Sequence, residues 1–232
     1  MQIPARIIAI RQETPTTKSL RLDLGGKEFR FLPGQWMDCY AEIDGEVEIA
    51  GYSMTSSPTT TDTIDLAVKL VGENPVTHYI HDRARVGDML HIEVGGDFYY
   101  KRDMGDSLTL IAGGIGITPL MSIVRYVNDA APEVRLTLVY SAKAPSELLF
   151  HDDLNEIASK NKNIRCLFTV TQPTGEPWDG RVGRIDADML EKADIDLNAL
   201  FFICGPPSMV ADTVLMVEGL GVPTSRIKYE SW

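Results

Sequence analysis

The stretch SLTLIAGGIGITPLMSIV, which runs from Ser107 to Val124, decides the fold of this 232-residue chain. It reads as an apolar strand, a glycine-rich turn and the beginning of an apolar helix. Gly113, Gly114 and Gly116 carry no Cβ, so the backbone can turn sharply there and come close to a ligand. The stretch therefore predicts a buried strand followed by a turn that is suited to a dinucleotide.

The helix after this turn opens at Thr118 and Pro119, where the missing N–H of proline costs nothing. The free N–H groups and the positive dipole of this helix end predict a seat for a pyrophosphate. The pattern G-x-G-x-x-P differs from the usual dinucleotide fingerprint, which has glycine or alanine at its last place. Taken by itself, the turn can equally be plain strand-to-helix geometry.

Charge and composition exclude several classes of partner. The net charge of −11 argues against nucleic acid and anionic membranes, because binding to phosphates needs a basic surface. Two adjacent glycines and a proline interrupt the apolar stretch, so it does not predict a membrane span. The first residues lack the pattern of a secretion signal, and we expect a soluble, cytoplasmic protein. The scattered cysteines and the pair His78 and His81 predict no metal site.

The first part of the chain, residues 1–102, has the short apolar–polar alternation of strands, broken by turn residues. The predicted strands are Ala5–Arg11, Ser19–Leu24, Gln35–Glu42, Glu48–Thr55, Thr63–Leu70 and Asp88–Val94. One helix is predicted, over Val76–Ala84. This pattern indicates an all-β domain, a small antiparallel Greek-key barrel.

The second part, residues 106–232, alternates strands with helices, and its strands are almost continuously apolar. The predicted strands are Leu108–Ala112, Arg135–Tyr140, Ile164–Thr169, Leu200–Cys204 and Arg226–Tyr229. The predicted helices are Pro119–Ala130, Ser146–Ser159, Asp186–Lys192 and Ser208–Gly219. This pattern predicts an α/β domain with a doubly wound parallel sheet.

Five motifs occur together and in order along the chain. They are Gly51-Tyr52-Ser53-Met54, Val76-Thr77, the Gly-Ile-Gly-Ile-Thr-Pro turn, Cys204-Gly205-Pro206-Pro207-Ser208-Met209 and Tyr229-Glu230-Ser231-Trp232. In this combination the sequence resembles the ferredoxin–NADP reductase-like superfamily over essentially its whole length. The resemblance implies a barrel domain that binds FAD, with FMN less favoured, and an α/β domain that binds NADH or NADPH.

On the flavin side, the resemblance implies that residues 52–55 lie along the isoalloxazine ring. Tyr52 would stack on one face of the ring. The Ser53 hydroxyl would lie near flavin N5, an atom that alternates between protonated and unprotonated forms. Because a hydroxyl can both donate and accept a hydrogen bond, Ser53 is a candidate catalytic residue. Met54 and Thr55 would contact the cofactor beside them. Without the resemblance, Tyr52 and Ser53 would be a strand residue and a turn residue.

Two further positions concern the phosphates of the flavin. The family's arginine, which pairs with flavin phosphate, is Ala50 here, so a strong charge-assisted contact is missing. Val76 and Thr77 match the start of the family's short helix, whose N-terminus can hold a pyrophosphate. The alternative is that Thr77 only caps that helix.

On the nicotinamide side, the resemblance assigns cofactor contacts to the glycine turn, to the end of the next strand and to the Cys-Gly-Pro segment. These residues are Gly113, Gly114, Gly116, Thr118, Pro119, Tyr140, Ser141, Cys204, Gly205 and Pro206. Cys204 would lie beside the reacting carbon, although a buried cysteine is often inert packing. Glu230 and Trp232 would approach the flavin, with Trp232 covering the ring face. A frayed tail is the alternative.

The resemblance implies an NAD(P)H-dependent flavoprotein reductase that passes a hydride to FAD and then electrons to a separate protein, either a ferredoxin or an oxygenase component. No Cys-x4-Cys-x2-Cys run places an iron–sulfur centre on this chain. The alternatives are a flavin reductase that uses diffusible flavin, a subunit of a larger complex, and a non-catalytic nucleotide-binding module.

Residues 169–172 lack the arginine that often binds a 2′-phosphate, which favours NADH, while Lys143 can partly replace that arginine. Four basic residues near the domain junction form either a local basic rim for an acidic acceptor or simply a solvated face. They are Arg83, Arg85, Lys101 and Arg102.

Overall fold

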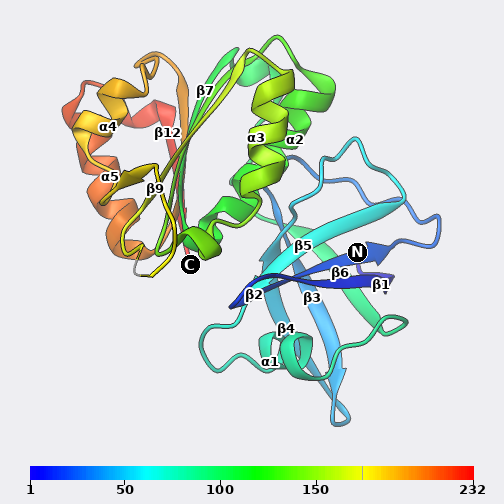
Figure 1. The fold of residues 1–232 in the computed structure, drawn as a ribbon. Coiled ribbons are helices and arrows are strands. Elements are labelled where there is room, and N and C mark those ends of the chain that lie inside the picture. Colours follow the sequence, from blue (N-terminus) through cyan, green and yellow to red (C-terminus); the bar gives the residue numbers. More distant parts are fainter. Residues whose placement is uncertain (174) are drawn as a thin grey trace.

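The computed structural model describes residues 1–173 and 175–232, which form two six-stranded sheets (Figure 1). The first sheet is antiparallel, with the strand order β4-β3-β6-β1-β2-β5. Its strands are β1 (Ile3–Thr14), β2 (Thr17–Asp23), β3 (Trp36–Ile43), β4 (Glu46–Ser53), β5 (Thr63–Lys69) and β6 (Met89–Gly95). Helix α1 (Pro75–Asp82) contacts β3, β4 and β5. This architecture confirms the predicted antiparallel barrel class.

The hairpin of β3 and β4 shows how the sequence sets the barrel. Asp44 and Gly45 both have positive φ, at 54° and 89°, as a tight two-residue hairpin turn requires. Alternate residues of β3 point into the barrel core, among them Met37 and Cys39. The hairpin pairing brings Ser53, at the end of β4, opposite Trp36.

The second sheet is parallel and has the strand order β10-β9-β8-β7-β11-β12. Its strands are β7 (Ser107–Gly113), β8 (Arg135–Ala142), β9 (Ile164–Val170), β10 (Arg181–Val182), β11 (Leu200–Gly205) and β12 (Ile227–Ser231). Its helices are α2 (Ile117–Ala130), α3 (His151–Lys160), α4 (Ala187–Lys192) and α5 (Pro207–Gly219). In the part of the chain that the structure describes, no helix is both long and apolar enough to cross a membrane.

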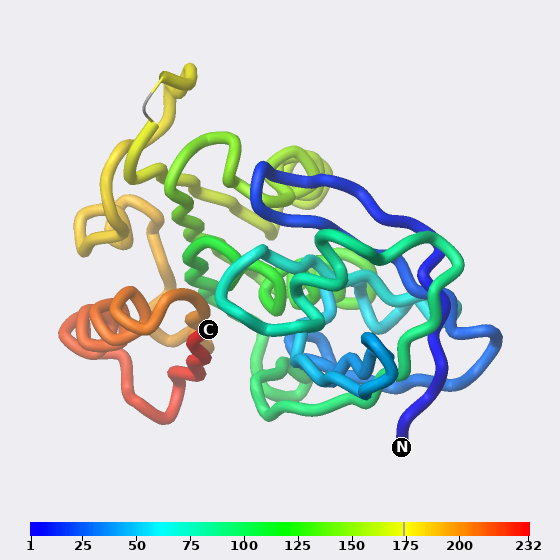
Figure 2. The backbone as a smooth tube through the Cα atoms, turned by 90° about the horizontal axis from the view of Figure 1, so that it is seen from below, coloured from blue at the N-terminus to red at the C-terminus, as the bar shows by residue number. Residues whose placement is uncertain are grey.

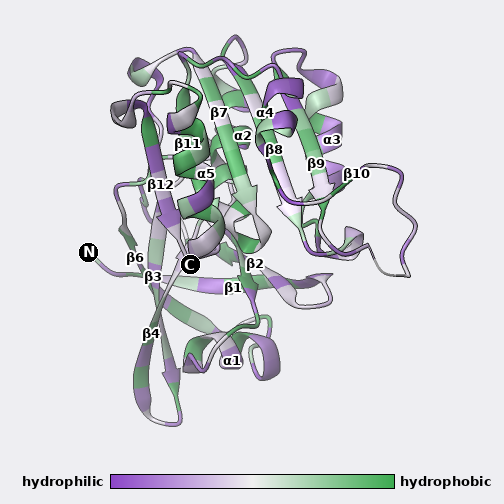
Figure 3. Cartoon of the chain, turned by 90° about the vertical axis from the view of Figure 1, so that its left-hand side faces the viewer, coloured by the Kyte–Doolittle hydropathy of each residue, from purple (hydrophilic) through white to green (hydrophobic). Residues whose placement is uncertain are grey.

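This sheet is doubly wound, as predicted. From β7 the chain continues through β8, β9 and β10 on one side, and later returns to place β11 and β12 on the other. Helices α2 and α3 therefore cover one face and α4 and α5 cover the other (Figure 1). The central strands β7 and β11 are mainly hydrophobic, whereas the edge strand β12 is more hydrophilic (Figure 3). Between β7 and β11 the connections diverge, which opens a crevice at the carboxyl ends of these strands.

Two elements differ from the sequence-based prediction. The helix predicted over Ser146–Ser159 is wrong at its start, because a short 3₁₀ turn at Pro145–Glu147 precedes an α3 that begins only at His151. Phe150 separates the two pieces with a left-handed backbone (φ of 62°), which a continuous helix cannot include. The two-residue strand β10 was not predicted, because a strand this short carries no alternation pattern.

The barrel and the parallel sheet share part of one core. Phe98 and Tyr100, which follow β6, are buried among residues of the second sheet. Their rings lie edge-on to Phe202 of β11, with centroids 5.4 and 6.5 Å away. The view from below places the C-terminus near the middle of the molecule and the N-terminus at its periphery (Figure 2). The last residues of the chain therefore lie at the junction of the two halves.

Candidate functional site

A pocket of about 450 Å³ lies between the barrel and the parallel sheet. This volume falls within the range of about 300–1,000 Å³ that is typical of small-molecule sites. The barrel contributes β4, the end of β5 and the start of α1, and the other half contributes the glycine turn, the start of α2 and the last residue. Lining residues with polar or aromatic side chains include Tyr52, Ser53, Lys69, Thr77, Thr118 and Trp232. The fold thus brings sequence-predicted residues from both halves to one cavity.

Tyr52 is fixed in this pocket by a hydrogen bond to α1. Its hydroxyl lies 2.8 Å from the Thr77 hydroxyl, and burial raises the pKa of Tyr52 to about 12. The cap of α1 is Asn74, whose side chain accepts hydrogen bonds from Val76 N at 2.9 Å and Thr77 N at 3.2 Å. Helix capping by Thr77 is therefore excluded. The Val76 side chain packs in the barrel core, so this residue presents only its backbone at the start of α1.

Ser53 lines the pocket, whereas the two residues after it do not. Among the described residues, its hydroxyl makes no hydrogen bond, so this group is free to orient toward a ligand. The Met54 side chain is wholly buried in the barrel core. Thr55 is also buried and lines a different pocket together with Arg125, which donates a hydrogen bond to its carbonyl. Neither side chain lines the shared pocket, and their contacts with a cofactor stay a prediction.

The three glycines of the turn have different surroundings. Gly114 has a φ of +54° and open space where a Cβ would lie. A Cβ on Gly116 would lie 2.3 Å from the carbonyl oxygen of Cys204, and one on Gly113 would lie 2.9 Å from the Met209 sulfur. Two of the glycines are thus required by close packing against the end of β11 and the start of α5. Gly114 is half-buried and lines a small adjoining pocket together with Lys69 and Ile115.

The start of α2 supports this turn. The Thr118 hydroxyl donates to the carbonyl of Ile115 at 2.9 Å, and both residues line the pocket. Pro119 is buried in the first turn of the helix and packs rather than faces a ligand. The predicted helix N-terminus therefore lies at the pocket, with Thr118 as its pocket-facing side chain.

Tyr140 lies in the core of the parallel sheet. It is wholly buried, and its hydroxyl accepts a hydrogen bond from Leu149 N at 3.2 Å. Its side chain does not reach the predicted adenosine contact, because the segment before α3 closes over it. Ser141, the next residue, is half-buried beside Gly113 in the parallel pairing of β8 with β7.

Cys204 and Glu230 occupy neighbouring strands at the end of the sheet. Cys204 is wholly buried, and burial raises the pKa of its thiol well above the usual range. The Glu230 Oε2 atom is buried without a hydrogen-bond partner among the described residues. Burial raises the pKa of Glu230 from 4.5 to about 7. Its carboxyl can therefore hold or release a proton near neutral pH.

The chain ends in an ordered strand and a pocket-lining tryptophan. Strand β12 continues to Ser231, and the Trp232 N–H donates to the Gly205 carbonyl at 3.3 Å. Trp232 lines the pocket and is 49% exposed as a whole residue. A frayed tail does not describe this arrangement. Pro206, which follows Gly205, is exposed at the start of α5.

Lys69 and Asn74 also line the pocket, and sequence reasoning missed both. The Lys69 ammonium lies 3.6 Å from the carboxylate of Glu147, across the junction between the two halves. Asn74 carried a usable signal, since asparagine directly before a helix-opening proline is typical of a helix start. Lys69 carried none, because its place depends on how β5 closes against β4.

Comparison with known proteins agrees with both halves of this arrangement. Residues 4–100 match the model of the oxidoreductase FAD-binding domain, and residues 110–214 match that of the oxidoreductase NAD-binding domain. The chain is 35% identical to oxidoreductase NAD-binding domain-containing protein 1 of Danio rerio, over 98% of this chain and 91% of that protein. It is 32% identical to the glycine betaine monooxygenase reductase subunit of Chromohalobacter salexigens, over 88% of this chain and 56% of that protein.

A solved structure shows the same fold. The crystal structure of a ferredoxin–NADP⁺ reductase from Neisseria gonorrhoeae with bound FAD and NADP aligns with a TM-score of 0.84 and 21% identity. The alignment covers 99% of this chain and 98% of that one. The chain therefore belongs to the family of oxidoreductases that combine an FAD-binding domain with an NAD-binding domain, and it has the fold of a ferredoxin–NADP⁺ reductase.

Proposed function

We propose that this oxidoreductase is an NAD(P)H-dependent flavoprotein reductase that delivers electrons to a separate acceptor protein, an oxygenase component or a ferredoxin. The observation that carries the proposal is the shared pocket, in which Tyr52 and Ser53 of the barrel and Thr118 and Trp232 of the other half line one cavity. A protein that binds a flavin ring and a nicotinamide ring in one cavity makes their reaction an oriented, effectively intramolecular step. The similarity to an oxygenase reductase subunit supports a separate acceptor.

In this proposal residues 1–102 hold the flavin. When bound, FAD supplies the ring that accepts a hydride from NAD(P)H and gives up electrons singly or in pairs. Tyr52, restrained by Thr77, offers a flat ring for stacking. Ser53 offers a hydroxyl that can donate or accept a hydrogen bond. The N-terminus of α1, capped by Asn74, faces the same pocket and suits a phosphate.

Residues 106–232 hold the nicotinamide dinucleotide in this proposal. The open space beside Gly114 and the N-terminus of α2 suit its pyrophosphate. Cys204, at the end of β11, contributes packing and shape, since its thiol is buried and stays protonated. Trp232 occupies space that a nicotinamide ring needs, and Glu230 holds a proton close by.

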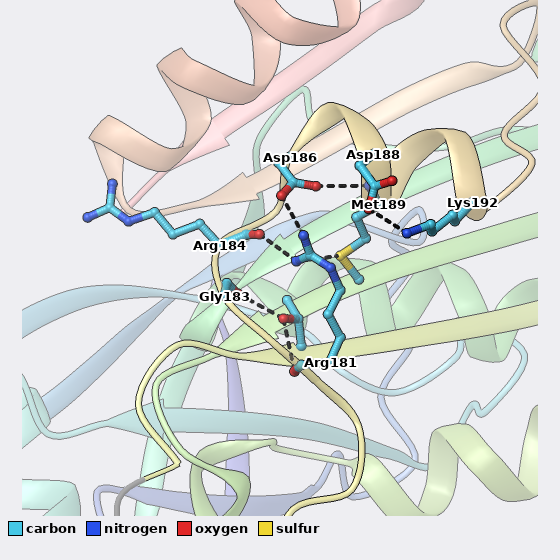
Figure 4. A network of polar contacts seen from close by, with 8 residues as sticks. Arg181, Gly183, Arg184, Asp186, Asp188, Met189 and Lys192 are labelled. Carbon is cyan, nitrogen blue, oxygen red and sulfur yellow. Dashed lines mark hydrogen bonds and ion pairs between the residues drawn. The ribbon is translucent and has the colours of Figure 1, made fainter.

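The cofactor preference that we propose is NADH. Arg181 lies beyond β9, where a 2′-phosphate could be recognised, yet its guanidinium is already engaged (Figure 4). It pairs with Asp186 and donates to the carbonyl of Arg184. The Arg184 side chain extends away from this network (Figure 4). Releasing Arg181 toward a phosphate would break both contacts, which supports the dinucleotide without that phosphate.

The acceptor that we favour is an oxygenase component. Two of the four cations of the expected basic rim are paired: Arg83 makes two hydrogen bonds of 2.9 Å to Asp44, and Arg102 pairs with Asp106 and Glu133. An acidic ferredoxin would gain little attraction from such paired arginines.

A second candidate function is an NAD(P)H:flavin reductase that uses flavin as a diffusible substrate. Ala50, which lines the pocket where the family has arginine, favours it. Lys69 lies in the same pocket, but its ammonium is shared with Glu147. Weak retention of the flavin tail would follow from the missing guanidinium.

The absorption spectrum of the purified protein tests these alternatives. Bound flavin that is bleached by NADH without air, more efficiently than by NADPH, is the result expected for the reductase. A colourless protein that reduces added flavin with NADH supports the second candidate. A protein that neither binds flavin nor oxidises NADH contradicts both and supports a non-catalytic nucleotide-binding module.

A further inference from the structure

One face of α2 carries a row of polar side chains that runs from the glycine turn toward the end of the helix. Its members are Thr118, Ser122, Arg125 and Asp129. Their positions, i, i+4, i+7 and i+11, place them on a single face of an α-helix. The first of them lines the pocket, and the other three contact the loop that follows β4. The row therefore connects the nicotinamide side of the site to the barrel.

The two central contacts of this row reach main-chain carbonyls. The Ser122 hydroxyl donates to the Ser56 carbonyl at 2.7 Å, and both residues are buried. Arg125 donates to the Thr55 carbonyl at 2.9 Å. Buried carbonyls need partners, and a partner on a rigid helix fixes the backbone that carries them. The outermost contact, from Thr59 to Asp129 at 3.3 Å, joins exposed side chains and constrains less.

The loop held by α2 begins directly after the flavin-facing end of β4. Thr55 and Ser56 lie only two and three residues beyond Ser53. Their other side is tied to β5, where Thr55 N donates to the Asp65 carbonyl at 2.8 Å and Asp65 N donates to the Ser56 hydroxyl at 3.1 Å. The segment is thus held between a barrel strand and α2, which leaves Ser53 little freedom to shift relative to the glycine turn.

Arg125 is itself restrained from three directions. Besides the Thr55 carbonyl, its guanidinium pairs with Asp153 of α3 at 2.9 Å. It also lies over the Phe150 ring, 5.2 Å from the centroid, where the left-handed backbone turns that ring toward it. The planar guanidinium can satisfy these partners together, which a lysine ammonium cannot.

We propose that Ser122 and Arg125 are positioning residues for hydride transfer: through the Thr55–Ser56 backbone they fix the distance between Ser53 and the glycine turn. This role rests on the proposed reductase function. Neither Ser122 nor Arg125 lines the shared pocket, so the proposed role predicts an effect on the rate of the chemical step rather than on binding. A displacement on the order of 1 Å between reacting groups can cost about 100-fold in rate.

The test compares Ser122→Ala and Arg125→Met with the parent protein, each loaded with FAD. We expect the rate constant for flavin reduction at saturating NADH to fall about 10-fold in each variant, while the dissociation constants of FAD and NADH change less than about twofold. The charge-transfer absorbance of the complex with NAD⁺ should weaken in parallel. Thr59→Ala, which removes the exposed outer contact to Asp129 and a hydroxyl–hydroxyl hydrogen bond to Ser57 within the loop, leaves the Ser122 and Arg125 contacts in place; it is the matched control and should react at the parental rate.

A second readout needs no cofactor. Hydrogen exchange of the flavin-free protein should accelerate in residues 53–57 and 114–118 of Ser122→Ala, and stay parental in Thr59→Ala. Variants that reduce flavin at the parental rate overturn the positioning role, and so do variants in which only the affinities change. The reductase function itself is refuted if the parent protein binds no FAD and oxidises no NADH. That result needs no variant, so it is distinct from a failure of the positioning role.

Discussion

Glu230 lies opposite Cys204 in the parallel pairing of β12 with β11. Both side chains lose solvent at this position, and burial raises the pKa of each. The thiol therefore stays protonated at neutral pH, whereas the carboxyl titrates there, at a pKa of about 7. The pair places one exchangeable proton at the end of the sheet, close to the pocket-lining Trp232.

Glu230 should make the stability of the protein depend on pH. Its pKa is about 7 in the folded chain against an ordinary 4.5, so the folded state holds a proton that the unfolded state releases between these values. The free energy of unfolding should therefore fall as pH rises through this window. Glu230→Gln should flatten the curve, as measured by urea unfolding at a series of pH values. Equal slopes for parent and variant would show that the carboxyl is not buried.

Ser53→Ala should slow the reduction of bound flavin by NADH about 10-fold to 100-fold, the scale of one lost transition-state hydrogen bond. The free hydroxyl in the pocket is the reason, because no described residue engages it. Flavin content should stay at the parental level. Stopped-flow traces that superimpose on those of the parent would mean that Ser53 has no part in the chemistry.

Trp232→Ala should tighten the binding of oxidised nicotinamide and strengthen its long-wavelength charge-transfer band. Aromatic stacking is worth about 0.5–1.5 kcal/mol beyond burial, and a dinucleotide must offset it when it displaces the indole. The preference between NADH and NADPH should weaken, and turnover can fall because the product leaves more slowly. Titration with NAD⁺ that gives parental affinity and an unchanged spectrum would place Trp232 off the flavin.

Ala50→Arg should tighten the binding of FAD by about 1–3 kcal/mol, the range for a hydrogen bond to a charged group. The new side chain would start from a position that already lines the pocket, beside Lys69. Equilibrium dialysis of the two proteins measures the difference. Retention that is unchanged or weaker would show that the flavin phosphates lie elsewhere.

Gly116→Ala should destabilise the protein by about 1–3 kcal/mol, because its Cβ would overlap main-chain atoms that cannot move aside cheaply. The atoms in question belong to Cys204 and Gly205, 2.3–2.6 Å away. Gly114→Asn is the matched variant, since asparagine tolerates a positive φ and open space surrounds that position. Thermal unfolding should separate the two, and equal losses would contradict the assigned roles of these glycines.

The sequence was sufficient to predict the fold class, because the two halves carry different and clear patterns. The first half alternates apolar and polar residues, and the strands of the second half are almost continuously apolar. The apolar run of β7 and the alternation of β3 each identify one kind of sheet. The start of α3 was not predictable in this way, since the left-handed backbone of Phe150 depends on tertiary contacts that include Arg125. Local pattern alone cannot show such a contact.

The sequence predicted some residues of the candidate site and missed others, because the place of the others depends on tertiary contacts. Tyr52, Ser53, Thr118 and Trp232 do line one pocket, and the family resemblance that the sequence motifs carry sufficed to find them. Tyr140 belongs to the core instead, because burial depends on how the segment before α3 folds over the strand. Residues that act through another element, such as Ser122, carry no motif at all. Their place follows only once α2 and the loop after β4 are seen together.

The rings of Phe98 and Tyr100 have a thermodynamic consequence. They leave the barrel and fill the core beneath β11, so the parallel sheet cannot keep its packing when the barrel opens. Domains that meet only at a polar surface melt one after the other, whereas a shared interior joins their unfolding into one event. Heat should therefore take this protein apart in a single cooperative transition, in which both cofactor sites are lost together.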